Sequence, residues 1–318
     1  MEAVNLVAHA QPIYSPDLAL NISVIIVNYN AGSMLEKCVT SILASEQKVE
    51  IIIVDNASVD NSLDDLLSSF PDESMLTIHH NKSNLGFAKA CNIGTALATG
   101  RYLLYLNPDT ILEKKTLLTM QASMARNQDA GMVGGMIVNA DGSEQAGGRR
   151  SVPTPWRTFV RVFKLSKLSS RYPRLFSDFL LNQTPTPDEP VQVEAISGAC
   201  MMVRRGALED VGPMDEGYFM HCEDLDWCMR FRQKEWKILF VPSAKLTHHQ
   251  GACSKSRPIF VEWHKHKGMM RFYRKFFRHQ YPGLLMWLVG LGVWLRFGMV
   301  ALLYGSKQIA ARLGLRSG

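Results

Sequence analysis

The feature that most constrains the fold is a set of short apolar runs that alternate with segments of helical character. The runs at residues 22–28, 49–54 and 102–106 are almost continuously apolar, as expected for strands buried on both faces of a sheet. Helices are expected at residues 33–44, 62–70, 86–99 and 113–126, and further strands at 76–79, 131–138 and 237–241. Strands that alternate with helices predict an α/β fold with a mixed, mainly parallel sheet flanked by helices.

Polar side chains follow three of these runs at the points where the predicted strands end. Asn28 and Asn30 follow the first run, Asp55 closes the second, and Asn107 and Asp109 follow the third. Ligands of open α/β sheets bind in the crevice outside the carboxyl ends of the strands. We therefore expect these side chains to line one ligand-binding crevice.

A second group of polar residues lies in residues 218–230, which read YFMHCEDLDWCMR. Glu223, Asp224 and Asp226 stand there among aromatic and apolar side chains, and the spacing predicts a helix that begins at about Glu223. A carboxylate in the first helical turn faces unpaired backbone N–H groups, which hold it ionised and in place, as a general base requires. In the simpler interpretation, Glu223 and Asp224 only cap the helix.

Asp109 and two histidines suggest a site for a divalent cation. A fixed carboxylate can hold Mg²⁺ or Mn²⁺ that also binds a diphosphate, and Mn²⁺ accepts an imidazole nitrogen. His248 and His249, which follow the last predicted strand, are the candidates for that nitrogen. As alternatives, Asp109 caps a helix and the histidines have structural roles. Asp55 either accepts an N–H of a pyrimidine base or closes an Asx turn.

Seven short motifs occur along the chain in a fixed order. They are IIVNYN (25–30), VDNAS (54–58), NLGFAKACNIG (84–94), LNPDT (106–110), SGACMMVRR (197–205), FMHCEDLDWCMR (219–230) and HHQG (248–251). Together they resemble the family 2 inverting glycosyltransferases, particularly the rhamnosyltransferase-like branch, over about residues 22–255. Each motif is weak alone, but the ordered set is specific. The resemblance implies a GT-A fold, a nucleotide-sugar donor and a divalent cation, Mn²⁺ or Mg²⁺.

The resemblance also implies roles for individual residues. Asp224 matches the catalytic base of the family's E-D motif, and Glu223 stands beside it. Asp109 matches the metal-binding acid of the D-x-D motif, whose first position is Asn107 here, and His248, rather than His249, matches the metal-binding histidine. The residues expected at the donor are Asn28, Asn30, Asp55 (at the base), Asn84, Gly86, Asn92 and Asn107.

These roles together imply an inverting, metal-dependent glycosyltransferase. The cation would neutralise charge on the departing nucleoside diphosphate while Asp224 removes the proton of the acceptor hydroxyl. The branch implies dTDP-rhamnose as donor and a lipid-linked saccharide of a bacterial cell-surface polysaccharide (O-antigen, capsule or exopolysaccharide) as acceptor. The alternatives are a UDP-hexose donor and a non-catalytic membrane-bound scaffold that binds glycan or nucleotide.

The distribution of charge divides the chain into parts. Residues 255–318 hold 12 Lys and Arg against one Glu, whereas the whole chain has a formal charge of +6. Aromatic residues alternate with these cations over residues 259–281, and residues 283–304 are almost wholly apolar apart from Arg296. We expect an irregular leader at residues 1–21, a GT-A domain at residues 22–255, and a helical C-terminal tail at residues 256–318 that associates with a membrane.

The apolar part of this tail is long enough to span a bilayer, which needs about 20 residues. A central arginine costs about 2.5–3.5 kcal/mol on insertion scales, so helices lying on anionic lipid are favoured over a true span or a buried oligomer contact. The expected location is the cytoplasmic face of the bacterial plasma membrane. The long apolar run disfavours a nucleic acid partner, and an oligomer is left open. Six scattered cysteines without a C-x-x-C pair fit a reduced protein.

Overall fold

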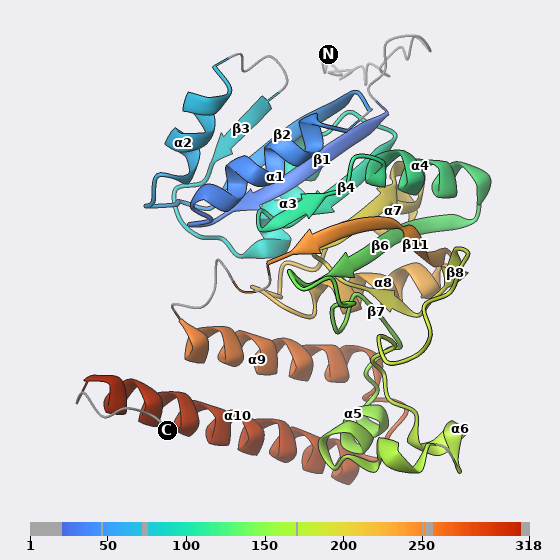
Figure 1. The fold of residues 1–318 in the computed structure, drawn as a ribbon. Helices are drawn as coiled ribbons and strands as arrows, with labels where there is room; N and C mark the ends of the chain where they lie inside the picture. Colours follow the sequence, from blue (N-terminus) through green and yellow to red (C-terminus); the bar gives the residue numbers. More distant parts are fainter. Residues whose placement is uncertain are drawn as a thin grey trace, which may run out of the picture.

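The computed structural model describes residues 21–45, 47–71, 76–169, 171–249, 251 and 257–312. The expected leader, apart from Asn21, and the expected boundary between residues 255 and 256 lie outside these described residues. A nine-stranded mixed sheet forms the centre, with helices on both faces (Figure 1). Its strands are β1 (Ile22–Asn28), β2 (Val49–Asp55), β3 (Leu76–His80), β4 (Tyr102–Leu106), β5 (Thr110–Leu112), β6 (Ala130–Val138), β8 (Val191–Gln192), β10 (Cys200–Arg204) and β11 (Lys237–His248).

The strand order places the polar strand ends along one edge. The order is β3-β2-β1-β4-β10-β6-β11-β5, with β8 beside β11. Strands β3, β2, β1 and β4 are parallel, and β10 runs antiparallel between β4 and β6. Cys200, the first residue of β10, is paired with Leu106, the last residue of β4. The segment just before β10 therefore lies at the carboxyl end of β4, and the expected mainly parallel α/β fold is confirmed.

Helices cover both faces of the sheet. The helices on one face are α1 (Ser33–Leu43), α2 (Ser62–Ser69) and α4 (Thr116–Arg126). The helices on the other face are α3 (Phe87–Leu97), α7 (Arg205–Val211), α8 (Glu223–Gln233) and α9 (Pro258–Phe276). The last helix, α10 (Gly283–Arg312), lies antiparallel to α9 at the outside of this layer (Figure 1).

Helix α9 packs into the core beside the central sheet, although the sequence placed it in the tail. Phe272 and Tyr273 are fully buried, Phe277 just after α9 is nearly so, and all three pack in the cluster under the sheet. Helix α10, in contrast, leaves most of its large apolar side chains exposed. Its segment Gly283–Lys307 is long and apolar enough to cross a membrane, with a mean hydropathy of 1.8.

Strand β11 is longer than the sequence predicted, because it continues past Pro242. Its pairing with β6 shifts register between Val241 and Lys245, so the proline falls in a bulge rather than ending the strand. Gly135 of β6 makes this possible, since a side chain there would collide with the carbonyl of Ala244. The consequence is functional, because His248 becomes the last residue of β11 and pairs with β5 beside Asp109.

Residues 139–169 and 171–190 form loops, short helices and one short strand. They contain β7 (Arg149–Arg150), α5 (Pro155–Val162), the 3₁₀ helix η2 (Leu165–Leu168) and α6 (Pro173–Phe176). Strand β7 pairs with β9 (Ala195–Ile196) in a small second sheet.

Candidate active site

Asn28 and Asp55 are register partners at the carboxyl ends of β1 and β2. The Asn28 amide donates to Asp55 Oδ1 at 2.9 Å, and Asp55 also accepts the backbone N–H and the hydroxyl of Ser58. Asp55 is thus held in place with 4% of its surface exposed. Its backbone bond reaches the N–H three residues on, one residue beyond that of an Asx turn. The contact of Asp55 with a base stays a prediction.

Asn30, Asn84 and Gly86 shape the backbone beside this pair. Asn30 has a positive φ of 52° and accepts the N–H of Val59, and Asn84 accepts the N–H of Gly86 at 3.0 Å. Gly86 has a φ of 86° and lies so close to Phe219 that a Cβ would be 2.6 Å from its carbonyl oxygen. Only glycine suits both conditions, so Gly86 joins the start of α3 to the loop before α8.

Asn92 of α3 holds the same loop. Its amide nitrogen donates to the carbonyl of Met214 at 2.9 Å and to Glu216, and its oxygen accepts the N–H of Met214 at 3.0 Å. Both ends of the amide are therefore engaged within the protein. The geometry gives Asn92 a structural role, and its expected contact with the donor stays a prediction.

Asp109 and His248 lie side by side, and their binding of a metal ion stays a prediction. His248 Nε2 lies 3.2 Å from Asp109 Oδ1 and 3.4 Å from the amide nitrogen of Asn107, and both His248 and Asp109 are buried. His249 reaches the same turn through its backbone, which donates to the Asp109 carbonyl. Among the described residues, no three side chains of His, Cys, Asp and Glu gather around one point.

Gln145 holds the ring of His248, and no motif in the sequence pointed to it. Its side-chain oxygen lies 2.6 Å from His248 Nδ1, and its amide nitrogen donates to the His248 carbonyl. When His248 carries its proton on Nδ1 and donates a hydrogen bond from it to Gln145, the lone pair of Nε2 faces Asp109. Asp109 Oδ1 and His248 Nε2 are close enough for both to bind one divalent cation, which would leave further positions on the cation for phosphate and water.

The chain enters α8 through two strained residues that fix its first turn. His221 and Cys222 have positive φ values of 64° and 71°, a conformation that costs energy for residues other than glycine. The carboxylates of Glu223 and Asp224 then lie at the helix N-terminus and are buried. Both the catalytic and the capping interpretation expected a helix from this point.

Asp224 is engaged on one oxygen and open on the other. Its Oδ2 pairs with Arg150 of β7 and accepts the N–H of Gly198 at 3.1 Å. Its Oδ1 accepts only the N–H of Leu225 among the described residues. Since a carboxylate oxygen has two acceptor sites, Oδ1 can take one more hydrogen bond, from an acceptor hydroxyl.

Glu223 differs from its neighbour. Burial, reinforced by the charge of Asp224, raises the pKa of Glu223 to about 8, and its Oε2 has no hydrogen-bond partner among the described residues. Partial burial lowers the pKa of Arg150, but the charge of Asp224 and its hydrogen bond outweigh this effect, so the pKa of Arg150 is raised. At neutral pH, Glu223 is therefore mainly protonated. Arg150 pairs with the neighbouring acid, Asp224.

One short segment joins the candidate base to the candidate metal loop. Gly198 donates its N–H to Asp224, and the carbonyl of the next residue, Ala199, accepts the N–H of Asn107 at 3.0 Å. The segment ends where β10 begins, at the carboxyl end of β4. Asp224 and the Asn107–Asp109 turn are therefore held by consecutive residues.

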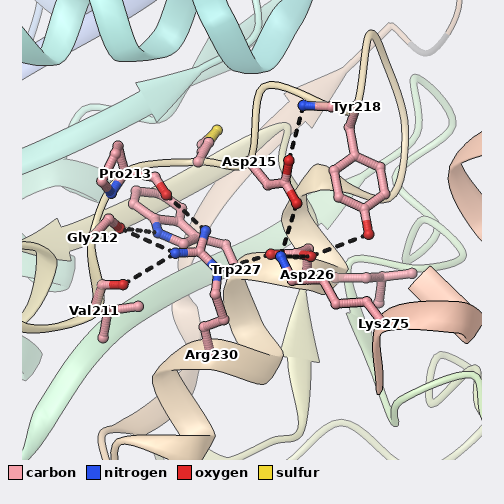
Figure 2. Close-up of polar contacts among 12 residues, drawn as sticks. Val211, Gly212, Pro213, Asp215, Tyr218, Asp226, Trp227, Arg230 and Lys275 are labelled. Carbon is pink, nitrogen blue, oxygen red and sulfur yellow. Dashed lines mark hydrogen bonds and ion pairs between the residues drawn. The ribbon is translucent and has the colours of Figure 1, made fainter. Parts of the chain in front are cut away.

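The third acid of α8, Asp226, has a structural place. It is fully buried and accepts from Arg230 at 2.8 Å and from Tyr218 at 3.1 Å, while Lys275 of α9 lies 2.6 Å from its Oδ2 (Figure 2). Arg230 also donates to the carbonyls of Val211 and of the two residues after it. Asp226 thus ties α8 to the end of α7 and to α9.

The comparison with known proteins identifies the family of the chain. Residues 23–212 match the family model described as Glycosyl transferase family 2. The chain belongs to glycosyltransferase family 2. It is therefore a glycosyltransferase, and its relatives place it with the rhamnosyltransferase-like members that the motifs indicated.

Two curated relatives of this family 2 enzyme are rhamnosyltransferases. An N-acetylglucosaminyl-diphospho-decaprenol L-rhamnosyltransferase of Mycobacterium tuberculosis is 28% identical over 240 residues, which cover 71% of this chain and 75% of the relative. The rhamnosyltransferase WbbL of Escherichia coli is 24% identical over 262 residues, which cover 76% of this chain and 88% of the relative.

Solved structures show the same GT-A fold. The mannosyltransferase PcManGT of Pyrobaculum calidifontis, in complex with GDP-Man and Mn²⁺, matches with a TM-score of 0.56 and 17% identity over 95% of this chain and 78% of that one. GalNAc-T7 with UDP, GalNAc and Mn²⁺ matches with a TM-score of 0.55 and 19% identity over 74% of this chain, which spans 45% of GalNAc-T7. These likenesses confirm the fold.

Proposed function

We propose that this family 2 enzyme transfers an L-rhamnosyl group from dTDP-rhamnose to a lipid-linked saccharide with inversion at the anomeric carbon. The proposal extends to the synthesis of a bacterial cell-surface polysaccharide. Its support is the pair of rhamnosyltransferase relatives, one of which is named for a diphospho-decaprenol acceptor. The proposed site comprises Asp224 and Glu223 for catalysis, Asp109 and His248 for the cation, and Asp55 with Asn107 for the donor.

The observation that carries the proposal is the link through Gly198 and Ala199. It holds Asp224 beside the Asn107–Asp109 turn, so a base for the acceptor and ligands for a donor diphosphate lie at one edge of the sheet. Inverting transfer needs a base on one side of the anomeric carbon and charge stabilisation on the leaving group at the other. A pure scaffold would need neither arrangement.

The protein's own residues supply the general base, fix its orientation and would hold the cation. Asp224 Oδ1 has a free acceptor position, which takes a hydrogen bond from the hydroxyl of the acceptor saccharide. Asp224 then removes the proton of this hydroxyl as the hydroxyl oxygen attacks the anomeric carbon. Arg150 and the N–H of Gly198 hold the other oxygen, so the carboxylate keeps its orientation. Asp109 and His248 would hold the divalent cation, which supplies charge neutralisation on the departing diphosphate. The transfer is a single displacement, so no enzyme nucleophile is needed.

The proposal places the enzyme on the cytoplasmic face of the plasma membrane, attached through the tail. Helix α10 presents large apolar side chains to the surroundings, and Leu284, Leu302 and Leu303 are each more than 60% exposed. Its segment Gly283–Lys307 satisfies the length of a span, and its exposed apolar surface also suits a helix lying in the interface. The GT-A domain at residues 22–255 and the tail at 256–318 remain our proposed division, with α9 packed into the domain.

The experiment measures rhamnosyl transfer and nucleotide binding in wild type, Asp224→Asn and Asp64→Asn. Asp64 is an exposed acid on α2 and serves as the matched control. We expect Asp224→Asn to lose transfer at least about 100-fold, the range of general base catalysis, while it keeps dTDP affinity in calorimetry with Mn²⁺. Asp64→Asn should match wild type in both assays.

The donor is tested by the same calorimetry with dTDP and UDP, with and without Mn²⁺. Metal-dependent binding that prefers dTDP supports the rhamnosyl donor, whereas a preference for UDP replaces it with a UDP-hexose. Full transfer activity in Asp224→Asn overturns the assignment of the base. Binding of neither nucleotide by folded protein replaces the enzyme with the scaffold.

A further inference from the structure

The segment between β7 and β8 carries a surface that the proposed reaction does not use. We call residues 155–176, which comprise α5, η2 and α6, the insert. Its inner side is packed on the protein, since Val160 is fully buried and the Thr158 hydroxyl lies 2.7 Å from the hydroxyl of Tyr273 on α9. Thr154 caps α5 by accepting the N–H of Arg157. The insert is therefore a fixed part of the fold.

The outer side of α5 is an exposed aromatic stripe. Trp156, Phe159 and Phe163 recur at helical spacing and contact one another. Trp156 and Phe159 are stacked with ring centroids 5.5 Å apart, and the Phe159 and Phe163 rings are tilted with centroids 4.5 Å apart. They are 44%, 44% and 61% exposed, and Leu175 of α6 is 56% exposed. Soluble proteins seldom leave contiguous apolar side chains of this size in water, so the stripe marks a contact surface.

The same insert is strongly basic. It contains six Lys and Arg and no Asp or Glu. Arg157 pairs with Glu194 and Arg161 with Asp178. The remaining four, which are exposed and make no ion pair with any described residue, are Lys164, Lys167, Arg171 and Arg174. Aromatic rings between unpaired cations fit the headgroup region of an anionic bilayer, where rings lie at the interface and cations meet lipid phosphates.

The insert adjoins the helix that we propose as the membrane anchor. A cavity of about 720 Å³ is lined by Trp156 and Arg174 of the insert and by Phe277 and Tyr281 at the end of α9. Helix α10 begins two residues after Tyr281, and its Trp287 is 62% exposed. In the view of Figure 1, α5 and this end of α10 lie on the same side of the molecule. The exposed aromatic side chains of α5 and the exposed apolar side chains of α10 therefore both lie near the junction of α9 and α10.

From these observations we infer that the insert is a second membrane-contacting element, which docks on anionic lipid beside α10. The inference rests on the membrane attachment proposed above and adds a contact on the catalytic body itself. Four residues separate Arg150, the partner of Asp224, from Pro155 at the start of α5. Docking of the insert would hold the base and its arginine near the lipid surface, where the saccharide of a lipid-linked acceptor is presented.

The test is the quenching of tryptophan emission by brominated lipids in vesicles that contain full-length protein. Three variants are compared with wild type, namely Trp156→Phe in the insert, Trp287→Phe on α10, and Trp236→Phe as a control. The indole N–H of Trp236 donates a hydrogen bond to Asp210 of α7, outside the insert and α10. We expect Trp156→Phe and Trp287→Phe each to lower the bromine-quenched part of the emission, and Trp236→Phe to leave it unchanged.

The outcomes separate the two membrane contacts. If Trp287→Phe lowers the quenched emission and Trp156→Phe does not, the insert faces water or another protein, and the inference is overturned while attachment through α10 stands. If neither variant lowers it, both the attachment and the inference fail. A stripe that instead binds a protein partner would show concentration-dependent association without quenching of Trp156.

The preference for anionic lipid has its own matched pair of variants. One removes the four unpaired cations of the insert by substitution with Gln, and the control removes Lys37, Lys48, Lys115 and Arg126, which are exposed on or beside α1 and α4. In wild type, brominated phosphatidylglycerol should quench Trp156 more than the same fraction of brominated phosphatidylcholine. We expect that excess to vanish in the insert variant and to persist in the control. If the excess quenching by phosphatidylglycerol persists in the insert variant, these four cations do not cause the preference for anionic lipid.

Discussion

Lys275 of α9 lies 2.6 Å from Oδ2 of Asp226, a fully buried carboxylate two residues after the candidate base Asp224 (Figure 2). The same ammonium lies 2.8 Å from Asp215 in the loop before α8. Lys275 therefore connects α9, the helix that precedes α10, with the first turn of α8 and with the loop before it.

Replacing Lys275 by Met, which keeps most of the aliphatic stem, should lower the free energy of unfolding by about 1–3 kcal/mol. The reason is that Asp226 would remain buried with fewer charged partners, and an uncompensated buried charge is costly. Urea unfolding provides the measurement. The control is Lys234→Met, because the pair of Lys234 with Asp210 is exposed and should contribute about 0–1 kcal/mol. Equal losses in both variants would show that Asp226 does not depend on Lys275.

Glu223 should make stability depend on pH. Its pKa is about 8 in the folded protein and 4.5 ordinarily, so the folded state binds the additional proton between these values. The stabilisation that the protonated Glu223 contributes to the free energy of unfolding is fully present below about pH 4.5. It is lost as the pH rises through 8. Glu223→Gln should reduce the decline in stability between pH 5 and pH 8, measured by chemical denaturation across that range. Glu209→Gln, at an exposed glutamate of α7, should keep the wild-type slope.

Gln145 should control metal affinity without touching the metal. In Gln145→Leu, the Nδ1 of His248 loses its acceptor, so the ring no longer presents Nε2 to Asp109 in a fixed orientation. We expect Mn²⁺ affinity in the presence of nucleoside diphosphate to fall about 10- to 100-fold in calorimetry. Gln128→Leu, at an exposed glutamine, is the control. Unchanged affinity in Gln145→Leu would count against His248 as a ligand.

Gly86 and Gly142 offer a matched pair for the loop before α8. Both have positive φ values, 86° and 82°, but a Cβ at Gly86 meets Phe219 whereas one at Gly142 meets nothing within 4 Å. Gly142→Ala should cost about 1–2 kcal/mol of stability from backbone strain alone. Gly86→Ala should cost more and should also lower transfer activity, because Phe219 and the loop leading to Asp224 must shift. Thermal unfolding and activity assays test both, and equal effects would exclude the contact with Phe219 as the cause.

The local pattern of the sequence predicted most elements of the sheet and the start of α8. Buried strands such as Ile22–Asn28 and Val49–Asp55 are short and apolar throughout, so their type follows from neighbouring residues alone. Polar residues at the strand ends could be placed at one edge because parallel strands end together. The same reasoning ended β11 at residue 241, because a proline normally interrupts a strand, and the bulge opposite Gly135 depends on a different strand.

The sequence by itself determined the α/β class, the GT-A resemblance and the candidates Asp109, Asp224 and His248. Only the tertiary structure decided which partners those candidates have. Arg150 reaches Asp224 across 74 residues of chain, and Gln145 reaches His248 across 103. Periodicity encodes which face of an element is apolar, but not which side chain a distant loop brings to it. For the same reason α9, basic and aromatic in sequence, was placed in the tail although its aromatic side fills the core.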